Sequence, residues 1–371
     1  MIPGQAQQFF EAAAAQSGAS AFEIERSVRF NNSDSANLSR TFPTAGNRRT
    51  WTWSGWVKKC KFTTSQAVFS AVGFGTGIYI NDVNNDGEIA VDFTTGTDNS
   101  TRTNRYTTAL SRDLSAWYHV VVAVDTTQST DSNRIKLYVN GTQQSLDNAG
   151  VGTWPALNGE GHINSAVAHS IGRRINTDDY YLNGYLAEVN FIDGQALAPT
   201  EFGETNDDGL WVPKEASFTS PNDGTTWSSS LSSAAGFSAS APATKAFDGD
   251  IFSKANTPSN TGGFYTGETN AIEFIPSSSI PFTSSVKVTG RGTGQTTAKA
   301  RIDTGSGYGG EINLSSDGIE TLISGSGNLV KLKVWTVTYA GENELGAILI
   351  DDVPLVDGAG TYGTNGFQLD F

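Results

Sequence analysis

The stretch Trp117-Tyr118-His119-Val120-Val121-Val122-Ala123-Val124 is a continuous apolar run with the length of one β-strand. A second strand pattern covers residues 134–139 and ends in Asn140-Gly141. Asn-Gly after such a run is a strong hairpin signal, because both residues tolerate the positive φ angles of a two-residue turn. The sequence therefore predicts two adjacent strands, the first of them buried on both faces or nearly so.

Residues 51–58 alternate between two sets of positions, as in a half-buried strand. One set is Trp51, Trp53, Gly55 and Val57, and the other is Thr52, Ser54, Trp56 and Lys58. Further strand patterns occur at residues 67–72, 77–80, 88–93 and 185–192. Many short strands with frequent turns are typical of a β-sandwich, so we expect an all-β fold.

The composition excludes several classes of protein. The chain has 371 residues, and its 24 Lys plus Arg against 38 Asp plus Glu give a net charge of −14. This charge argues against a nucleic acid or an anionic membrane as partner, because both need a basic face. Cys60 is the single cysteine, so an intrachain disulfide framework is excluded. No apolar run approaches the ~18 residues of a membrane span.

Strand patterns return in the second half of the chain and predict a second β-sandwich (271–275, 285–289, 299–302, 318–323, 329–337 and 346–353). We place the two sandwich domains, with jelly-roll architecture, at residues 22–214 and 215–357. Residues 358–371 are expected to form a C-terminal tail. Residues 1–21 are rich in Gln, Ala and other good helix formers and lack the pattern of a signal peptide. They are read as a short helix, either a frayed terminus or a peptide that docks on a larger assembly.

The first unit resembles the laminin-G-like, concanavalin-A-like lectin superfamily. Three segments carry the resemblance, which extends over residues 22–202: Trp117 to Asp125, Ile135-Lys136-Leu137-Tyr138-Val139-Asn140-Gly141, and Gly184-Tyr185-Leu186-Ala187-Glu188-Val189. The resemblance implies a lectin-like sandwich and leaves its ligand open.

Flanking segments resemble structural proteins of tailed bacteriophages, particularly marine ones. They are Glu25-Arg26-Ser27-Val28-Arg29-Phe30-Asn31, Leu38 to Phe42, residues 181–214, and the closing Tyr362-Gly363-Thr364-Asn365-Gly366-Phe367-Gln368-Leu369. The closing segment usually lies close behind the lectin-like domain, so the second unit looks like an insertion before it. The resemblance implies a virion protein that is assembled in the host cytoplasm and exposed on the particle. Residues 1–21 would bind other virion proteins, the chain would form a homo-oligomer, with a trimer by analogy, and a host-surface glycan would be contacted.

The second unit is more weakly similar to galactose-binding-like, discoidin-type jelly rolls through Ala243-Thr244-Lys245-Ala246-Phe247-Asp248-Gly249-Asp250. In that family the Asp-Gly-Asp loop often holds a structural Ca²⁺, and Asp248 and Asp250 match it. The Trp that commonly follows the loop is absent here. Two readings stay open, a Ca²⁺ site and a solvated turn, and no cofactor is required by either.

The sequence offers no complete catalytic motif, so we expect no enzyme activity. Glu188 lacks a partner carboxylate two or four residues away, His119 belongs to a strand motif, and Cys60 has no nearby base. Asp82-x-Asn84-x-Asp86-Gly87 begins like a calcium loop, but position twelve is Phe93 where a Glu is needed. Gly290-Arg291-Gly292-Thr293-Gly294 does not open a helix, which argues against a phosphate loop.

Aromatic residues in polar loops are candidates for contact with a glycan or a protein partner. They are Tyr180, Tyr181, Trp227 and Tyr265. The leading hypothesis is a non-enzymatic phage appendage (a fibre, a spike or a head decoration) that contacts host-surface glycans. A free carbohydrate-binding lectin and a polysaccharide depolymerase are the alternatives.

Overall fold

The computed structural model contains two compact units, which we describe separately. It describes residues 22–62, 64–73, 76–80, 86–96, 99–148, 152, 154–250, 253–258, 267–289, 298–314, 318–337 and 342–371. Unit 1 extends to Phe218 and includes Asn365–Phe371, and unit 2 is Thr219–Thr364. The predicted helix at residues 1–21 lies outside the described residues. Within them the helices are short 3-10 turns such as η4 (Pro199–Glu201), and the prediction of an all-β fold is confirmed.

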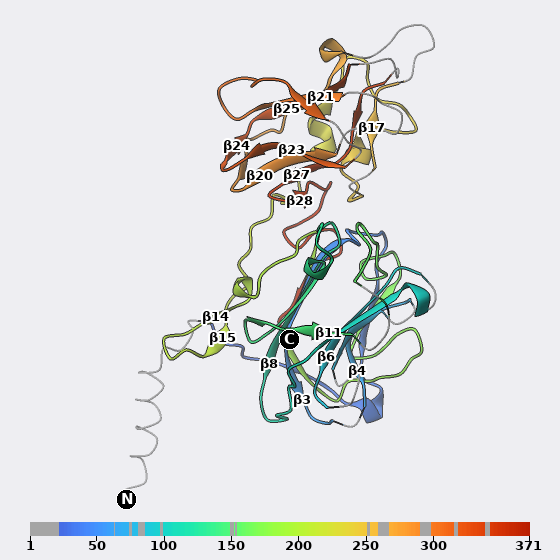
Figure 1. Cartoon of the computed structure of the whole chain (residues 1–371), viewed down its shortest axis with the longest axis vertical. Helices are drawn as coiled ribbons and strands as arrows, with labels where there is room; N and C mark the ends of the chain where they lie inside the picture. Colours follow the sequence, from blue (N-terminus) through green and yellow to red (C-terminus); the bar gives the residue numbers. More distant parts are fainter. Residues whose placement is uncertain are drawn as a thin grey trace, which may run out of the picture. The chain divides into compact units, whose positions relative to one another are not determined.

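Unit 1 is a sandwich of two antiparallel sheets (Figure 1). Sheet A runs in the order β1 (Val28–Phe30), β13 (Gly184–Asp193), β3 (Thr50–Lys59), β8 (Tyr118–Asp125), β9 (Ile135–Val139) and β10 (Thr142–Gln143). Sheet B runs in the order β11 (Leu146–Asp147), β7 (Arg102–Thr107), β6 (Ile89–Thr94), β5 (Gly77–Ile80), β4 (Gln66–Ala71), β12 (Ala168–Ile171) and β2 (Leu38–Thr41). The predicted alternation in β3 is confirmed, because Trp51, Trp53 and Val57 lie in the core between the sheets. The expectation of a half-buried strand is wrong, since Thr52, Ser54 and Trp56 on the other face are buried as well.

Unit 2 is a second, smaller sandwich. One sheet has the order β16 (Leu231–Ser232), β18 (Ile272–Phe274), β25 (Lys331–Thr336), β21 (Ala298–Asp303) and β22 (Ile312–Leu314). The other has the order β23 (Ile319–Ser324), β20 (Ser285–Thr289), β27 (Ile348–Ile350) and β28 (Val353–Pro354). Two short pairs accompany them, β17 (Ala255–Asn256) with β26 (Glu344–Leu345) and β19 (Ile280–Phe282) with β24 (Gly327–Leu329). Apolar residues of both sheets form one buried cluster.

The end of the chain returns to the first sandwich. β29 (Phe367–Leu369) pairs with β13, and the ring centroids of Phe367 and Phe191 are 5.8 Å apart. The predicted tail at residues 358–371 is therefore wrong, because residues up to 364 belong to unit 2 and the final segment, Asn365–Phe371, belongs to unit 1. The physical reason is that the apolar residues of this segment complete the core of unit 1. Unit 2 is thus inserted in the sequence of unit 1, as the position of the closing segment indicates.

A buried carboxylate holds the returning C-terminal segment in place. Asp193, at the end of β13, accepts hydrogen bonds from the Asn47 amide at 2.8 Å, the Asn164 side-chain amide at 2.6 Å and the Asn365 amide at 3.1 Å. The Asn365 side chain donates in turn to the carbonyl of Thr44 at 3.0 Å. Asp193 is 6% exposed and Asn365 is 1% exposed, so water cannot replace these bonds.

The hairpin of β14 (Gly203–Thr205) and β15 (Trp211–Pro213) packs on the outward face of sheet A. The contact is made by the indole ring of Trp211. Trp211 Nε1 donates to His119 Nδ1 at 3.0 Å, and the two rings are stacked. Because Nδ1 accepts, Nε2 carries the ring proton and donates to Ser54 Oγ at 2.9 Å. Glycine is needed at positions 141 and 203, since a Cβ there would lie 2.4 Å and 2.6 Å from the indole.

Replacing Asp193 should destabilise unit 1. The Asp193→Ala variant leaves buried donors of three residues without their acceptor, so we expect the free energy of unfolding to fall by at least about 3 kcal/mol. Urea unfolding followed by tryptophan fluorescence measures this change. The control is the exposed Asp207→Ala, expected to stay within about 0.5 kcal/mol of the parent. Equal stability of the two variants would contradict the role given to Asp193.

Lowering the pH should reduce the stability of unit 1 because of its buried histidines. Burial lowers the pKa of His119 from 6.5 to about 3 and that of His169 to about 4. Both are therefore held neutral in the folded chain, and their stabilising effect is complete above pH 6.5 and is lost as the pH falls towards these values. The free energy of unfolding measured across this range should decrease as the pH falls. Its dependence on pH should have a smaller slope in His119→Phe. His162→Phe is the control, and an unchanged slope in His119→Phe would disprove the assignment.

Candidate functional site

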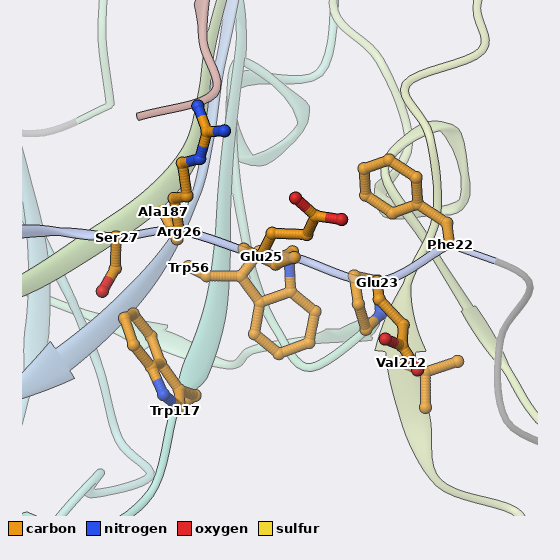
Figure 2. Close-up of a pocket in the computed structure, with 11 residues that line it drawn as sticks. Phe22, Glu23, Glu25, Arg26, Ser27, Trp56, Trp117, Ala187 and Val212 are labelled. Atoms are coloured by element: carbon orange, nitrogen blue, oxygen red, sulfur yellow. The ribbon is translucent and has the colours of Figure 1, made fainter.

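The outward face of sheet A carries a pocket beside the His119–Trp211 contact (Figure 2). Its volume is about 520 Å³, and the lining residues are Phe22, Glu23, Ile24, Glu25, Arg26, Ser27, Trp56, Trp117, Ala187, Val212 and Pro213. β3, β13, β15, the residue before β8 and the segment before β1 all contribute to the lining. The pocket is therefore a product of the fold and not of one motif.

Two tryptophans give the pocket its walls. Trp56 is 9% exposed, and one side of its ring stacks on His119 with a centroid distance of 5.0 Å. Its neighbour on β13 is Ala187, whose small side chain leaves the space open. Trp117 packs edge-on against Tyr185 at 6.4 Å. The walls are thus fixed by packing before any ligand arrives.

Polar groups at the rim have no partner in the described part of the chain. None of the described residues bonds to the indole N–H of Trp56, which Figure 2 shows within the pocket. The exposed carboxylates of Glu23 and Glu25 likewise have no ion-pair partner among the described residues. The pocket therefore offers the Trp56 N–H as a donor and the two carboxylates as acceptors beside its aromatic walls, with the Arg26 guanidinium also in the lining.

Sequence reasoning did not identify this site. Trp56 and Trp117 were assigned to strands, and nothing local in the sequence brings residues 22–27 to them. The available signal was Trp56 itself, because a large aromatic residue at an outward position of an alternating strand needs a cover or a ligand.

The predicted aromatic contact residues fall in different places. Tyr180 is 36% exposed, has a φ of 51°, and stacks under the Arg174 guanidinium at 3.9 Å. The Tyr181 hydroxyl donates to Asp178 at 2.6 Å. Trp227, in contrast, is 6% exposed in the core of unit 2 and donates to Asn222 at 3.2 Å, so it is not available as a contact residue. Tyr265 lies outside the described residues.

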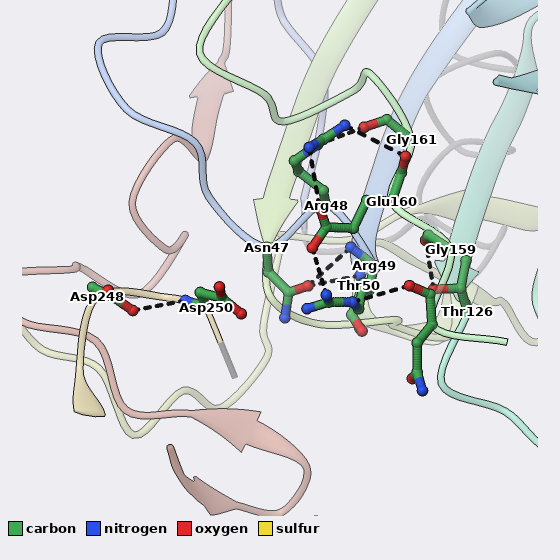
Figure 3. Close-up of polar contacts among 11 residues, drawn as sticks. Asn47, Arg48, Arg49, Thr50, Thr126, Gly159, Glu160, Gly161, Asp248 and Asp250 are labelled. Carbon is green, nitrogen blue, oxygen red and sulfur yellow. Dashed lines mark hydrogen bonds and ion pairs between the residues drawn. The ribbon is translucent and has the colours of Figure 1, made fainter. Parts of the chain in front are cut away.

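The Asp248 and Asp250 turn is exposed and closed on itself (Figure 3). Asp248 accepts from the Asp250 amide at 3.1 Å, from Lys245 Nζ at 3.2 Å and from Ser253 Oγ at 2.9 Å. No group of three or more His, Cys, Asp or Glu that could hold a metal occurs among the described residues. Ca²⁺ at this turn remains a prediction.

The remaining motifs give no further site where the structure describes their residues. Glu188 lies at the β-bulge of β13 with a φ of 45°, and burial raises the pKa of its carboxyl, to which Gln368 donates at 3.2 Å. Cys60 is exposed. The Asp82 and Asn84 positions of the calcium-like loop and the glycine-rich 290–294 lie outside the described residues. In the described part of the chain no helix is long and apolar enough to cross a membrane.

Comparison with known proteins finds distant similarities. Solved structures with similarity to the chain include the SAP-like pentraxin from Limulus polyphemus, with 18% identity over 48% of this chain and 80% of that chain and a TM-score of 0.34. Domains LG4-5 of the mouse laminin alpha1 chain show 12% identity over 88% of this chain and 89% of that chain, with a TM-score of 0.33. Tailspike protein 2 from Escherichia coli O157:H7 bacteriophage CAB120 shows 12% identity over 47% of this chain and 23% of that chain, with a TM-score of 0.33.

These likenesses are distant, and the search of curated proteins found no match. Residues 30–201 match a laminin G family model described as the concanavalin A-like lectin/glucanases superfamily. The match covers the strands from β2 to β13 that build the two sheets. Residues 30–201, which contain most strands of the two sheets of unit 1, are therefore similar to the concanavalin A-like lectin/glucanases superfamily.

Proposed function

We propose that the first sandwich binds a carbohydrate in the pocket between Trp56 and Trp117, as a non-enzymatic surface protein of a tailed-phage particle. The observation that carries the binding role is the pocket itself. Its volume of about 520 Å³ lies within the range of about 300–1,000 Å³ that is usual for small-molecule sites. An apolar, aromatic lining with a few placed polar groups is the usual chemistry of such sites.

The polar groups suit a saccharide. A sugar ring has apolar C–H faces that pack against indole rings, and hydroxyl groups that both donate and accept hydrogen bonds. The Trp56 N–H can donate to one hydroxyl, and Glu23 or Glu25 can accept from others. Trp56 and Trp117 are already packed on His119 and Tyr185, so little binding energy is lost in ordering the walls.

The buried Ser54–His119 pair supports a binding role over catalysis. A nucleophilic serine needs a histidine nitrogen that accepts its proton. Here Trp211 occupies Nδ1 and Nε2 carries the proton, so His119 cannot accept one from Ser54. Both residues are also 1% exposed, which keeps a substrate away from them.

The virion role is supported by the resemblance of residues 25–31, 38–42 and 362–369 to tailed-phage structural proteins. It includes assembly in the host cytoplasm, binding of residues 1–21 to other virion proteins, a homo-oligomer such as a trimer, and contact with a host-surface glycan. A free lectin is the second candidate, because the pocket would serve it equally well.

Two substitutions should weaken glycan binding, one by removing a wall of the pocket and the other by filling it. Trp117→Ala removes one wall, and Ala187→Leu fills the pocket without removing a polar group. Each should weaken binding by about tenfold or more, the effect of losing about 1.4 kcal/mol. Glycan-array screening followed by calorimetry measures this loss, with unfolding curves to confirm that the variants fold. Tyr180→Ala is the matched control. A loss of binding confined to that variant would place the site near Tyr180 and not in the pocket.

Residues 1–21 should decide incorporation into particles. Deleting them should leave the two sandwiches folded and glycan binding intact, but should remove the protein from purified phage particles. Mass spectrometry and antibody labelling of gradient-purified particles test this. Incorporation at the parental level would disprove the anchoring role, and absence of the full chain from particles would favour a free lectin.

A further inference from the structure

The charges around the pocket restrict which saccharide it can hold. Glu23 and Glu25 contribute two carboxylates to the lining and Arg26 contributes one guanidinium. All three side chains are exposed, and the first two carry no ion pair within the described residues. At neutral pH the lining therefore has an excess of one negative charge, in a chain whose net charge is −14.

This excess acts against an acidic ligand. A uronate, sialate or sulfate group would meet two like charges and one opposite charge, within a repulsive field from the whole chain. A neutral sugar meets no such penalty. A protonated amine would gain an attraction to either carboxylate, of the size of an exposed ion pair.

The tryptophans act in the same direction. The face of an indole ring carries partial negative charge and attracts a cation within about 6 Å of its centroid. Trp56 and Trp117 both line the space where a ligand would lie. Carboxylates at the rim and indole faces on the walls thus favour the same charge on the ligand.

We propose that the pocket selects an amine-bearing saccharide, a sugar with a free and protonated amino group, over neutral and acidic sugars. This inference rests on the proposed function, since it names the ligand class of the same site. The amine is placed at the rim beside Glu23 and Glu25, and the sugar ring is placed between the tryptophans. The Trp56 N–H donates to a ring hydroxyl.

The test compares ligands that differ mainly in charge. The full-length chain is presented with polymer conjugates of glucosamine and galactosamine, of their N-acetyl forms, and of glucuronic and galacturonic acid. The comparison is made at about pH 6, where the amines of the ligands are protonated. We expect the amine forms to bind roughly fivefold tighter than the N-acetyl forms at low salt, with weakest binding of the acids. High salt should reduce the difference.

The variant Glu23→Gln/Glu25→Gln separates this inference from the proposed function. It should keep binding to the N-acetyl forms and lose the preference for amines, while Arg26→Gln should keep that preference. Equal or tighter binding of the acids, or a preference that survives in the glutamine variant, would overturn the inference and leave carbohydrate binding standing. No binding of any conjugate, together with no response to Trp117→Ala on a glycan array, would overturn both.

Discussion

The buried carboxylate of Asp193 is the constraint on which the first sandwich depends. Its three hydrogen bonds join the approach to β3, the loop before β12 and the segment before β29. These parts are far apart in the sequence, and an entire second unit lies between β15 and Asn365. The entropic cost of closing a loop grows only slowly with its length. The buried, charge-assisted bonds of Asp193, together with the pairing of β29 on β13 and its apolar contacts, therefore hold the returning strand in place.

Strand β13 connects the hydrogen bonds of Asp193 to the pocket. β13 ends at Asp193 and holds Ala187 opposite Trp56. Trp56 stacks on His119, and His119 holds Trp211 through its Nδ1. Trp211 begins β15, whose next two residues, Val212 and Pro213, line the pocket. The walls are therefore extensions of the packed sheet, which gives the aromatic rings fixed positions.

The sequence predicted the periodic parts of the fold well. Alternation in β3, the apolar run of β8 and the Asn140-Gly141 turn each depend on neighbouring residues, and each was read correctly. Burial of single residues was less predictable. Trp227 looked like a loop aromatic but lies in a core, and Lys59 is 1% exposed, with its pKa lowered by burial to about 8. Such placements depend on tertiary neighbours, which no local pattern encodes.

The pocket could not be predicted for the same reason, and its origin also limits what can change it. Its lining comes from the segment before β1, from β3, from the residue before β8, from β13 and from β15. Only Glu23, Glu25, Arg26 and Ser27 among these residues are exposed, so only they can vary at little cost to stability. Substitutions of Trp56 would disturb the sheet, whereas substitutions in residues 23–27 would change the charge of the rim. Specificity can therefore change at the rim while the aromatic walls stay constant.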